Sequence, residues 1–311
     1  MHKKNMKHHL ILFYICISSS LLGMENPHQV VIIPGQNELG GDNFYEKRVK
    51  KSFMTYITQT PAFPWIDFGQ KHCVTDAQKT LTPLLNTLDK SASIIVHGTS
   101  QGTATAAKIA SLDTEKKIKV LFLESIMLSG NSAIVYNVFG ASHKAWQYYV
   151  LPYLARLIYP CYSPAGDNII DVYDKIDKEL PIIIAHATQD ACLSYNDAAA
   201  LYSYLKQKNH NVYFISKIGR SHVNLCSDRT LEDIANNYAD KEKLSDIIDT
   251  LNHDEPFIIQ KTHLEYFELI ENREKNIKKY HFLLSAIPYL TIASILFVCK
   301  AILQLSYNGQ H

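Results

Sequence analysis

Residues 93–110, SIIVHGTSQGTATAAKIA, change character in the middle of the stretch. An apolar run typical of a β-strand meets two glycines around a serine, and an Ala- and Thr-rich segment that favours a helix follows. Gly98 to Gly102 therefore fit the pattern G-x-S-x-G at a strand-to-helix junction, which is the context that this pattern requires. The glycines permit a turn tight enough to expose Ser100 above the carboxyl end of the strand.

Apolar runs elsewhere in the chain extend this junction into a sheet. Strands are expected at residues 30–33, 66–69, 94–97, 118–123, 182–187 and 212–215, and helices at 75–88, 101–112 and 196–206. Because continuous apolar strands separated by helices form parallel sheets that are covered on both faces, the expected fold class is α/β.

Two further side chains stand where a reactive serine would need them. A serine hydroxyl is a weak nucleophile near neutral pH and needs a base, which a carboxylate must orient. Asp190 lies just past the strand expected at 182–187, and His222 follows the strand expected at 212–215 within the sequence GRSH. The sequence therefore predicts a nucleophile, an acid and a base in this chain order.

Together these segments resemble the α/β-hydrolase superfamily, which contains serine esterases, lipases and peptidases. In that superfamily an H-G-x-x-D segment after one strand supplies the acid, and a G-x-x-H segment after the next strand supplies the histidine. Residues 186–190, HATQD, match the first segment except for Ala187, and residues 219–222, GRSH, match the second. The resemblance covers residues 30–234 and implies an α/β-hydrolase fold with a mostly parallel sheet. It assigns the catalytic roles to Ser100 as nucleophile, Asp190 as acid and His222 as base.

The acid has rivals in the sequence. Glu124 directly follows the strand expected at 118–123, which is another place where superfamily members carry the acid. Asp197 also lies near Asp190 in the sequence, but it is expected inside the helix at 196–206. Asp190 is the preferred interpretation, and Glu124 remains the alternative.

An oxyanion hole needs two amide donors. One is expected to be the backbone N–H of Gln101, where the helix directs its amides and its dipole at an oxyanion next to Ser100. The other is expected to be Gln36, in the loop IPGQNELGG after the first strand. This loop lacks the sequence HGGG found in many lipases and esterases, which leaves the identity of the second donor open, and a plain turn is the alternative role of its glycines.

The segment at about residues 131–180 is much longer than an ordinary crossover between two strands. It carries the aromatic-rich sequence AWQYYVLPYLARLIYPCY, in the place where hydrolases of this superfamily insert a helical cap. An apolar cap would favour an acyl or other hydrophobic substrate. The same aromatic residues also fit a core between the cap and the sheet.

Both ends of the chain are more hydrophobic than its middle. Residues 1–23 combine a basic start with an apolar run and are typical of a signal peptide or an N-terminal anchor. Residues 282–303 are expected to form a transmembrane helix because 282–299 carry no charge, although a buried C-terminal helix is the alternative. The interpretation is a hydrolase domain at 24–260, a juxtamembrane helix at 261–281 and an exported, membrane-anchored protein. The orientation stays open, because the basic sequence KNIKK precedes the expected span.

Composition argues against other classes of function. The 311 residues include 31 basic and 30 acidic side chains, and a formal charge of +1 provides no field that would select nucleic acid. Nucleotide-binding glycine motifs are absent from the sequence, and no Cys/His spacing resembles a zinc site. No cofactor and no metal is therefore expected, and the expected partners are a membrane and a small-molecule or lipid-like acyl substrate.

Six cysteines are present, of which Cys16 and Cys299 lie in the hydrophobic ends. In an exported domain the other four could pair in three ways. Cys192 and Cys226 form one possible disulfide, because each closely follows a proposed catalytic residue. The alternatives are reduced, buried thiols or pairing with Cys73 or Cys161.

The sequence as a whole predicts a membrane-tethered serine hydrolase that cleaves carboxylic esters or thioesters through an acyl-enzyme. Peptidase, amidase and acyltransferase activities fit the same residues, because neither fold nor triad determines the leaving group. A non-catalytic binding protein that kept the fold is the alternative from a different class.

Overall fold

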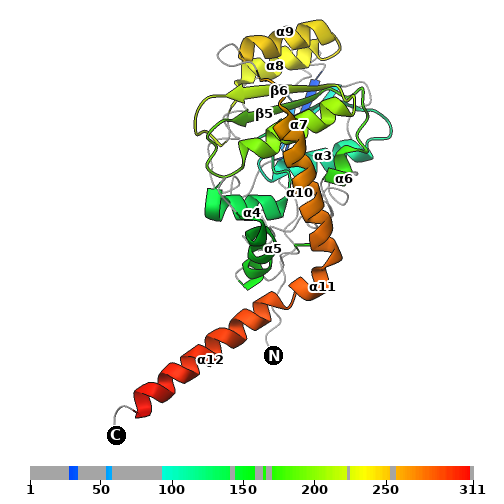
Figure 1. Ribbon diagram of the computed structural model, residues 1–311. Coiled ribbons are helices and arrows are strands. Elements are labelled where there is room, and N and C mark those ends of the chain that lie inside the picture. The colour runs from blue at the N-terminus through cyan, green and yellow to red at the C-terminus, as the bar shows by residue number, and fades with distance from the viewer. Residues whose placement is uncertain are drawn as a thin grey trace, which may run out of the picture.

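The computed structural model describes residues 28–33, 54–57, 93–140, 144–157, 164–165, 170–222, 225–252 and 257–308. Within these residues the strands are β1 (His28–Ile33), β2 (Met54–Ile57), β3 (Ser93–Thr99), β4 (Ile118–Glu124), β5 (Ile182–Ala187) and β6 (Val212–Lys217). They form one sheet in the order β2-β1-β3-β4-β5-β6, and every neighbouring pair is parallel. Figure 1 labels β5 and β6, which run side by side in the same direction. The expected parallel sheet is confirmed.

Burial explains why these segments form strands. β5, with the sequence IIIAHA, is buried along its whole length, and β4 is buried at all but one position. Both are continuous apolar runs, as expected for central strands that are covered on both faces. Strand β2 was not expected from the sequence. The strand expected at 66–69 and the helix expected at 75–88 lie outside the described residues.

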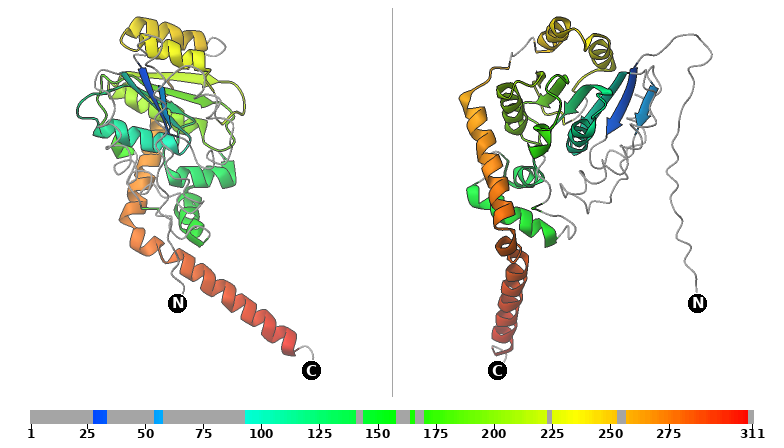
Figure 2. Two further views of the ribbon diagram at one scale, coloured as in Figure 1. Left: turned by 180° about the vertical axis from the view of Figure 1, so that it is seen from behind. Right: turned by 90° about the vertical axis from the view of Figure 1, so that its right-hand side faces the viewer.

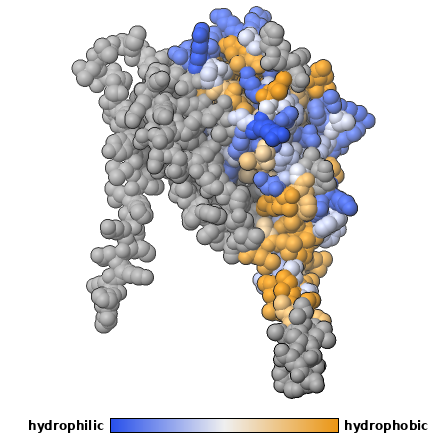
Figure 3. Space-filling model, turned by 90° about the vertical axis from the view of Figure 1, so that its left-hand side faces the viewer, coloured by the Kyte–Doolittle hydropathy of each residue, from blue (hydrophilic) through white to orange (hydrophobic). Residues whose placement is uncertain are grey.

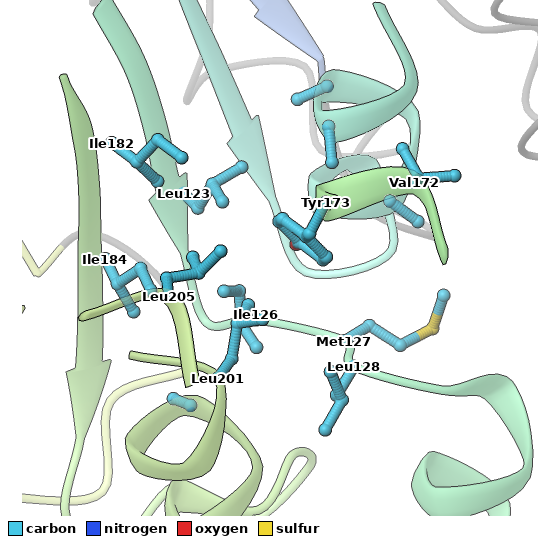
Figure 4. Packing of buried hydrophobic residues seen from close by; sticks show 14 of the residues in the cluster. Leu123, Ile126, Met127, Leu128, Val172, Tyr173, Ile182, Ile184, Leu201 and Leu205 are labelled. Carbon is cyan, nitrogen blue, oxygen red and sulfur yellow. The ribbon is translucent and has the colours of Figure 1, made fainter. Parts of the chain in front are cut away.

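Successive strand residues point to opposite faces and build two separate cores. On one face, Leu121, Leu123 and Ile184 pack with the helices α3 (Gly102–Leu112), α7 (Tyr195–Gln207) and α10 (Lys261–Lys279), and Figure 4 shows part of this cluster. On the other face, Phe122 and Ile183 pack with α8 (Asp228–Asn237) and α9 (Lys241–Leu251). Figure 2 shows these layers above and below the sheet.

Between β4 and β5 lies the helical insertion expected at about 131–180. Its described elements are α4 (Gly130–Phe139), α5 (Ala145–Leu154), a 3₁₀ turn η3 (Ala155–Leu157) and α6 (Ile170–Tyr173). Tyr148 and Tyr153 of α5 are fully buried, whereas Trp146 is 57% exposed. Part of the aromatic stretch therefore belongs to the core, which was the alternative interpretation of these residues.

The folded body does not end at residue 260, where the boundary of the hydrolase domain was expected, but continues into the next helix. Helix α10 packs against α7 and buries Phe267, Ile270 and Ile277 in the core, so the packed body continues through α10. After α11 (His281–Leu284), helix α12 (Ile287–Asn308) leaves the body (Figure 1). The segment His281–Lys300 is long and apolar enough to cross a membrane, with a mean hydropathy of 2.2, and only 6% of it is buried. It is not the buried C-terminal helix of the alternative interpretation. The expected N-terminal signal lies outside the described residues.

Candidate active site

Ser100 stands at the turn between β3 and α3 in a backbone conformation that side-chain-bearing residues rarely adopt. Its φ angle is +51°. Three hydrogen bonds hold this conformation: the Ser100 N–H donates to the Glu124 carbonyl at 2.9 Å, and Thr103 donates to the Ser100 carbonyl from its N–H at 3.0 Å and its hydroxyl at 2.6 Å. The strained turn predicted by G-x-S-x-G is present.

The first glycine of this pattern is needed for close packing between strand and helix. A Cβ atom on Gly98 would lie 2.7 Å from the Cβ of Ala106, 2.8 Å from the carbonyl oxygen of Gly102 and 2.8 Å from the Cα of Thr103. Two of these atoms belong to the backbone and cannot move without shifting the helix. Gly98 therefore allows α3 to start directly behind Ser100.

His222 links Ser100 to Asp190. Its Nε2 lies 2.9 Å from the Ser100 Oγ, and its Nδ1 lies 2.8 Å from Oδ2 and 3.0 Å from Oδ1 of Asp190. The Asp190 Oδ1 also accepts hydrogen bonds from the backbone N–H groups of Cys192 and Leu193, at 2.7 and 3.1 Å. The three residues predicted as the catalytic set are thus joined in one hydrogen-bonded chain.

The electrostatics of the acid follow from its surroundings. Burial raises the pKa of Asp190, but the hydrogen bonds from His222 and the Cys192 amide outweigh burial, so that the net effect lowers the pKa below its ordinary value. An ionised Asp190 accepts a hydrogen bond from the Nδ1–H of His222, and the proton stays on Nδ1. The lone pair of Nε2 is then left to accept a proton from Ser100.

His186 is a second buried histidine that lies next to the Asp190 carboxylate. Its Nδ1 accepts the backbone N–H of Ile126 at 3.1 Å, so its proton is on Nε2, which lies 3.5 Å from the Asp190 Oδ2 and 3.3 Å from the Leu193 carbonyl. Burial lowers the pKa of His186 to about 4, despite the nearby carboxylate of Asp190. His186 is therefore neutral near pH 7 and does not form an ion pair with Asp190. The Asp190 carboxylate can then stabilise a positive charge on His222.

Glu124, the alternative acid, has other partners. It is fully buried, its Oε2 lies 2.9 Å from the Nε2 of His97, and its Oε1 accepts the backbone N–H of Leu225. The neighbouring Ser125 donates its hydroxyl to the backbone carbonyl of His222. Glu124, the last residue of β4, and Ser125, which follows it, both hold the loop that carries His222, a role that the sequence did not reveal.

Helix α4 holds the loop that carries Asp190. The Tyr136 hydroxyl donates to the backbone carbonyl of Asp190 at 2.9 Å, and the Asn137 side-chain amide donates to the carbonyl of Cys192 at 2.8 Å. No local sequence pattern marked these two residues, because their partners are more than fifty positions away. Of the two expected oxyanion donors, Gln101 stands directly before α3, and Gln36 lies outside the described residues.

Cys192 and Cys226 are not joined by a disulfide. Cys226 belongs to the core on the face of α8 and α9, whereas Cys192 packs against the core on the opposite face. The proposed pairing is therefore wrong. Among the described residues, Cys192, Asp190 and His222 form one group whose ligand-type atoms all lie within 4.8 Å of one another.

Comparisons with known proteins return likenesses of fold only. No protein-family model and no curated protein matches the chain. Among solved structures, the chain is similar to the esterase Pf2001 of Pyrococcus furiosus at 15% identity and a TM-score of 0.45, covering 73% of this chain and 84% of that one. It is also similar to Est1E from Butyrivibrio proteoclasticus, at 17% identity, a TM-score of 0.42 and coverages of 72% and 90%. A carboxyl esterase from Bacillus coagulans matches at 16% identity and a TM-score of 0.44, with coverages of 74% and 91%. These likenesses are distant, so the chemistry of this chain has to follow from its own residues.

Proposed function

We propose that this chain is a serine hydrolase of the α/β-hydrolase superfamily that cleaves carboxylic esters or thioesters. The observation that carries the proposal is the continuous hydrogen-bonded chain from the Ser100 Oγ through His222 to Asp190, with steps of 2.9 and 2.8 Å. These distances lie within the reach that a nucleophile and its base require. The positive φ of Ser100 supports the same role, because strained backbone is concentrated at functional sites.

The proposed reaction proceeds in two halves. As the Ser100 Oγ attacks the substrate carbonyl carbon, its proton passes to the Nε2 of His222, and Asp190 stabilises the imidazolium. The tetrahedral oxyanion accepts a hydrogen bond from the Gln101 N–H at the start of α3. His222 then returns the proton to the leaving alcohol or thiol. In the second half, water attacks the acyl-enzyme by the same route and releases the acid and free Ser100.

An active-site-directed fluorophosphonate tests the nucleophile directly. We expect one label, mapped to Ser100 by peptide mass, and no label on folded Ser100→Ala protein. Ser111→Ala is the matched control and should label normally, because Ser111 lies near the other end of the same helix and donates its hydroxyl to the Lys108 carbonyl. Labelling that persists in Ser100→Ala protein would exclude the mechanism, and a binding protein without catalysis would take no label at all.

The leaving group is tested separately. A panel of p-nitrophenyl esters, acyl thioesters and anilides of the same acyl group should be cleaved in that order of preference. Faster cleavage of the anilide would favour the peptidase or amidase alternative. Transfer of the acyl group to an added alcohol in excess over hydrolysis would favour an acyltransferase.

We also propose that α12 tethers the hydrolase to a membrane. The segment that leads into α12 lies next to the insertion, since the Tyr153 hydroxyl of α5 lies 2.8 Å from the Nδ1 of His281 at the start of α11, and α12 itself contacts α5. Trp146, near the start of α5, is 57% exposed, and Leu157, at the end of η3, is 42% exposed. Figure 3 shows that hydrophobic residues gather at the base of the body and continue into the C-terminal helix. A membrane at this position would bring the insertion close to lipid-like acyl substrates.

A further inference from the structure

We propose that Asp190, Cys192 and His222 also form an inhibitory site for a thiophilic divalent cation such as Zn²⁺. The three side chains supply a carboxylate oxygen, a sulfur and an imidazole nitrogen, which are the ligand types that zinc binds in proteins. All three ligand atoms already lie within 4.8 Å of one another. Binding of the cation is independent of the proposed function, whereas inhibition rests on it.

The geometry requires only local movement. In a tetrahedral zinc site, ligand atoms are separated by about 3.3 to 3.8 Å, given bonds of roughly 2.0 to 2.3 Å. The Nδ1 of His222 and the Oδ2 of Asp190 are 2.8 Å apart and would have to separate slightly. The sulfur of Cys192 would complete the third position by a side-chain rotation, and water would take the fourth.

The carboxylate is already held in a suitable orientation. The Asp190 Oδ1 accepts the backbone N–H groups of Cys192 and Leu193, so this oxygen can keep its partners while Oδ2 turns to a cation. Such second-layer hydrogen bonds orient metal-binding carboxylates in general. The side chain of His222 is 27% exposed, which leaves a route from solvent to the site.

Binding at this position would remove the base by changing the tautomer of His222. A cation on Nδ1 occupies the lone pair of that nitrogen, so the single proton of the neutral ring moves to Nε2, and the thiol proton of Cys192 is released to solvent. Nε2 then donates to Ser100 and cannot accept its proton. Inhibition therefore needs no blockage of the substrate site.

A spectroscopic titration tests binding apart from catalysis. Co²⁺ added to reduced Ser100→Ala protein should bind at one equivalent and produce the near-ultraviolet charge-transfer band of a thiolate ligand. Cys192→Ser should lose the band, and Cys226→Ser, which alters the thiol on the opposite face of the sheet, should keep it. A missing band in the Ser100→Ala protein, or one that survives Cys192→Ser, overturns the proposal whether or not the chain is a hydrolase.

Two further measurements complete the test. Zn²⁺ should protect Cys192 of the unmodified protein from alkylation by N-ethylmaleimide at least tenfold, as read by peptide mass, which needs no variant to fold. Zn²⁺ should also inhibit ester cleavage, with reversal by a chelator. The half-inhibitory concentration should rise at least tenfold in Cys192→Ser, each protein being compared with its own metal-free rate. Unchanged alkylation, or equal inhibition of both proteins, contradicts the proposal.

Discussion

At the scale of single residues, the reactivity proposed for Ser100 depends on Asp190, Glu124 and Ser125 as well as on His222. Asp190 keeps a low pKa although it is buried, because His222 and the Cys192 amide donate hydrogen bonds to it. Glu124 and Ser125 hold the loop that carries His222, through Leu225 and the His222 carbonyl. Acid and alternative acid therefore have separable roles: one orients the imidazole, and the other positions its loop.

These roles predict different kinetic effects. Asp190→Asn should lower kcat for p-nitrophenyl esters by roughly 10³- to 10⁴-fold, because the amide favours the imidazole tautomer with its proton on Nε2. Glu124→Gln keeps an oxygen acceptor for the Leu225 N–H and should lower kcat by less than about tenfold, a barrier change below roughly 1.4 kcal/mol. Steady-state kinetics on both variants, with circular dichroism as a check of folding, decides the assignment. A larger loss in Glu124→Gln would make Glu124 the acid.

A second prediction at this scale concerns Gly98. Gly98→Ala should destabilise the protein by about 1 to 3 kcal/mol, because the added methyl group meets the Gly102 carbonyl and the Thr103 Cα at 2.8 Å. Urea unfolding followed by fluorescence measures this loss. The added Cβ also meets the Ala106 Cβ at 2.7 Å, so Ala106→Gly in the Gly98→Ala background should recover part of it. Additive losses in the double variant would show that the two positions do not contact each other.

At the scale of elements, buried polar groups connect the C-terminal helix α10 to the insertion. Glu274 of α10 accepts the Tyr148 hydroxyl at 2.6 Å and the Asn131 amide at 2.9 Å, and it also accepts the Ser129 hydroxyl at the start of α4. Helix α4 in turn holds the loop of Asp190. Helix α10 is thus linked to the candidate active site through α4.

The second buried carboxylate of this region makes stability depend on pH. Burial raises the pKa of Asp197 to about 6 from an ordinary value of 3.8, although Ser132 and Tyr266 donate hydrogen bonds to it. The folded state then binds a proton more tightly than the unfolded state between these values. Stability should therefore fall as the pH rises from about 4 to above 6, by roughly 3 kcal/mol from this group.

Asp197→Asn removes this titration. Urea unfolding at pH 4.5 and pH 7.5 should show a smaller loss of stability over this interval in the variant than in the unmodified protein. The comparison cancels the contributions of groups that do not interact with Asp197. Glu274, whose pKa burial also raises, interacts electrostatically with Asp197, so the difference between the two proteins includes this coupling. An equal loss in both proteins would show that Asp197 ionises in the fold as readily as in the unfolded chain.

At the scale of the whole molecule, the body and α12 bury their apolar residues in different ways. Helix α10 places Phe267, Ile270 and Ile277 in the core, whereas α12 leaves most of its apolar side chains exposed. Exposed apolar surface of this extent is unfavourable in water and marks a surface for lipid or protein. The proposed tether, α12, and the folded body should therefore be separable at the turn after Lys279.

Two truncations test this separation. The full-length protein should pellet with membranes and resist carbonate extraction, whereas residues 24–280 should remain soluble and keep ester hydrolysis. Ending the chain at residue 260 should unfold the protein. This truncation removes α10 and exposes to water the apolar side chains of α7 that α10 covers. If residues 24–280 are unfolded while the full-length protein is soluble without detergent, α12 contributes to the fold instead of a membrane tether.

Local patterns in the sequence determined the strands β1, β3, β4, β5 and β6, the tight turn at Ser100, and the positions of Asp190 and His222 at strand ends. Such features depend on the hydrophobic period and on residues within one turn of each other. Only the tertiary structure decided that Cys192 and Cys226 lie on opposite faces, that α10 belongs to the body, and that α4 holds the Asp190 loop. These contacts join segments far apart in the chain, and the packing of side chains across the sheet, which no local pattern encodes, brings them together.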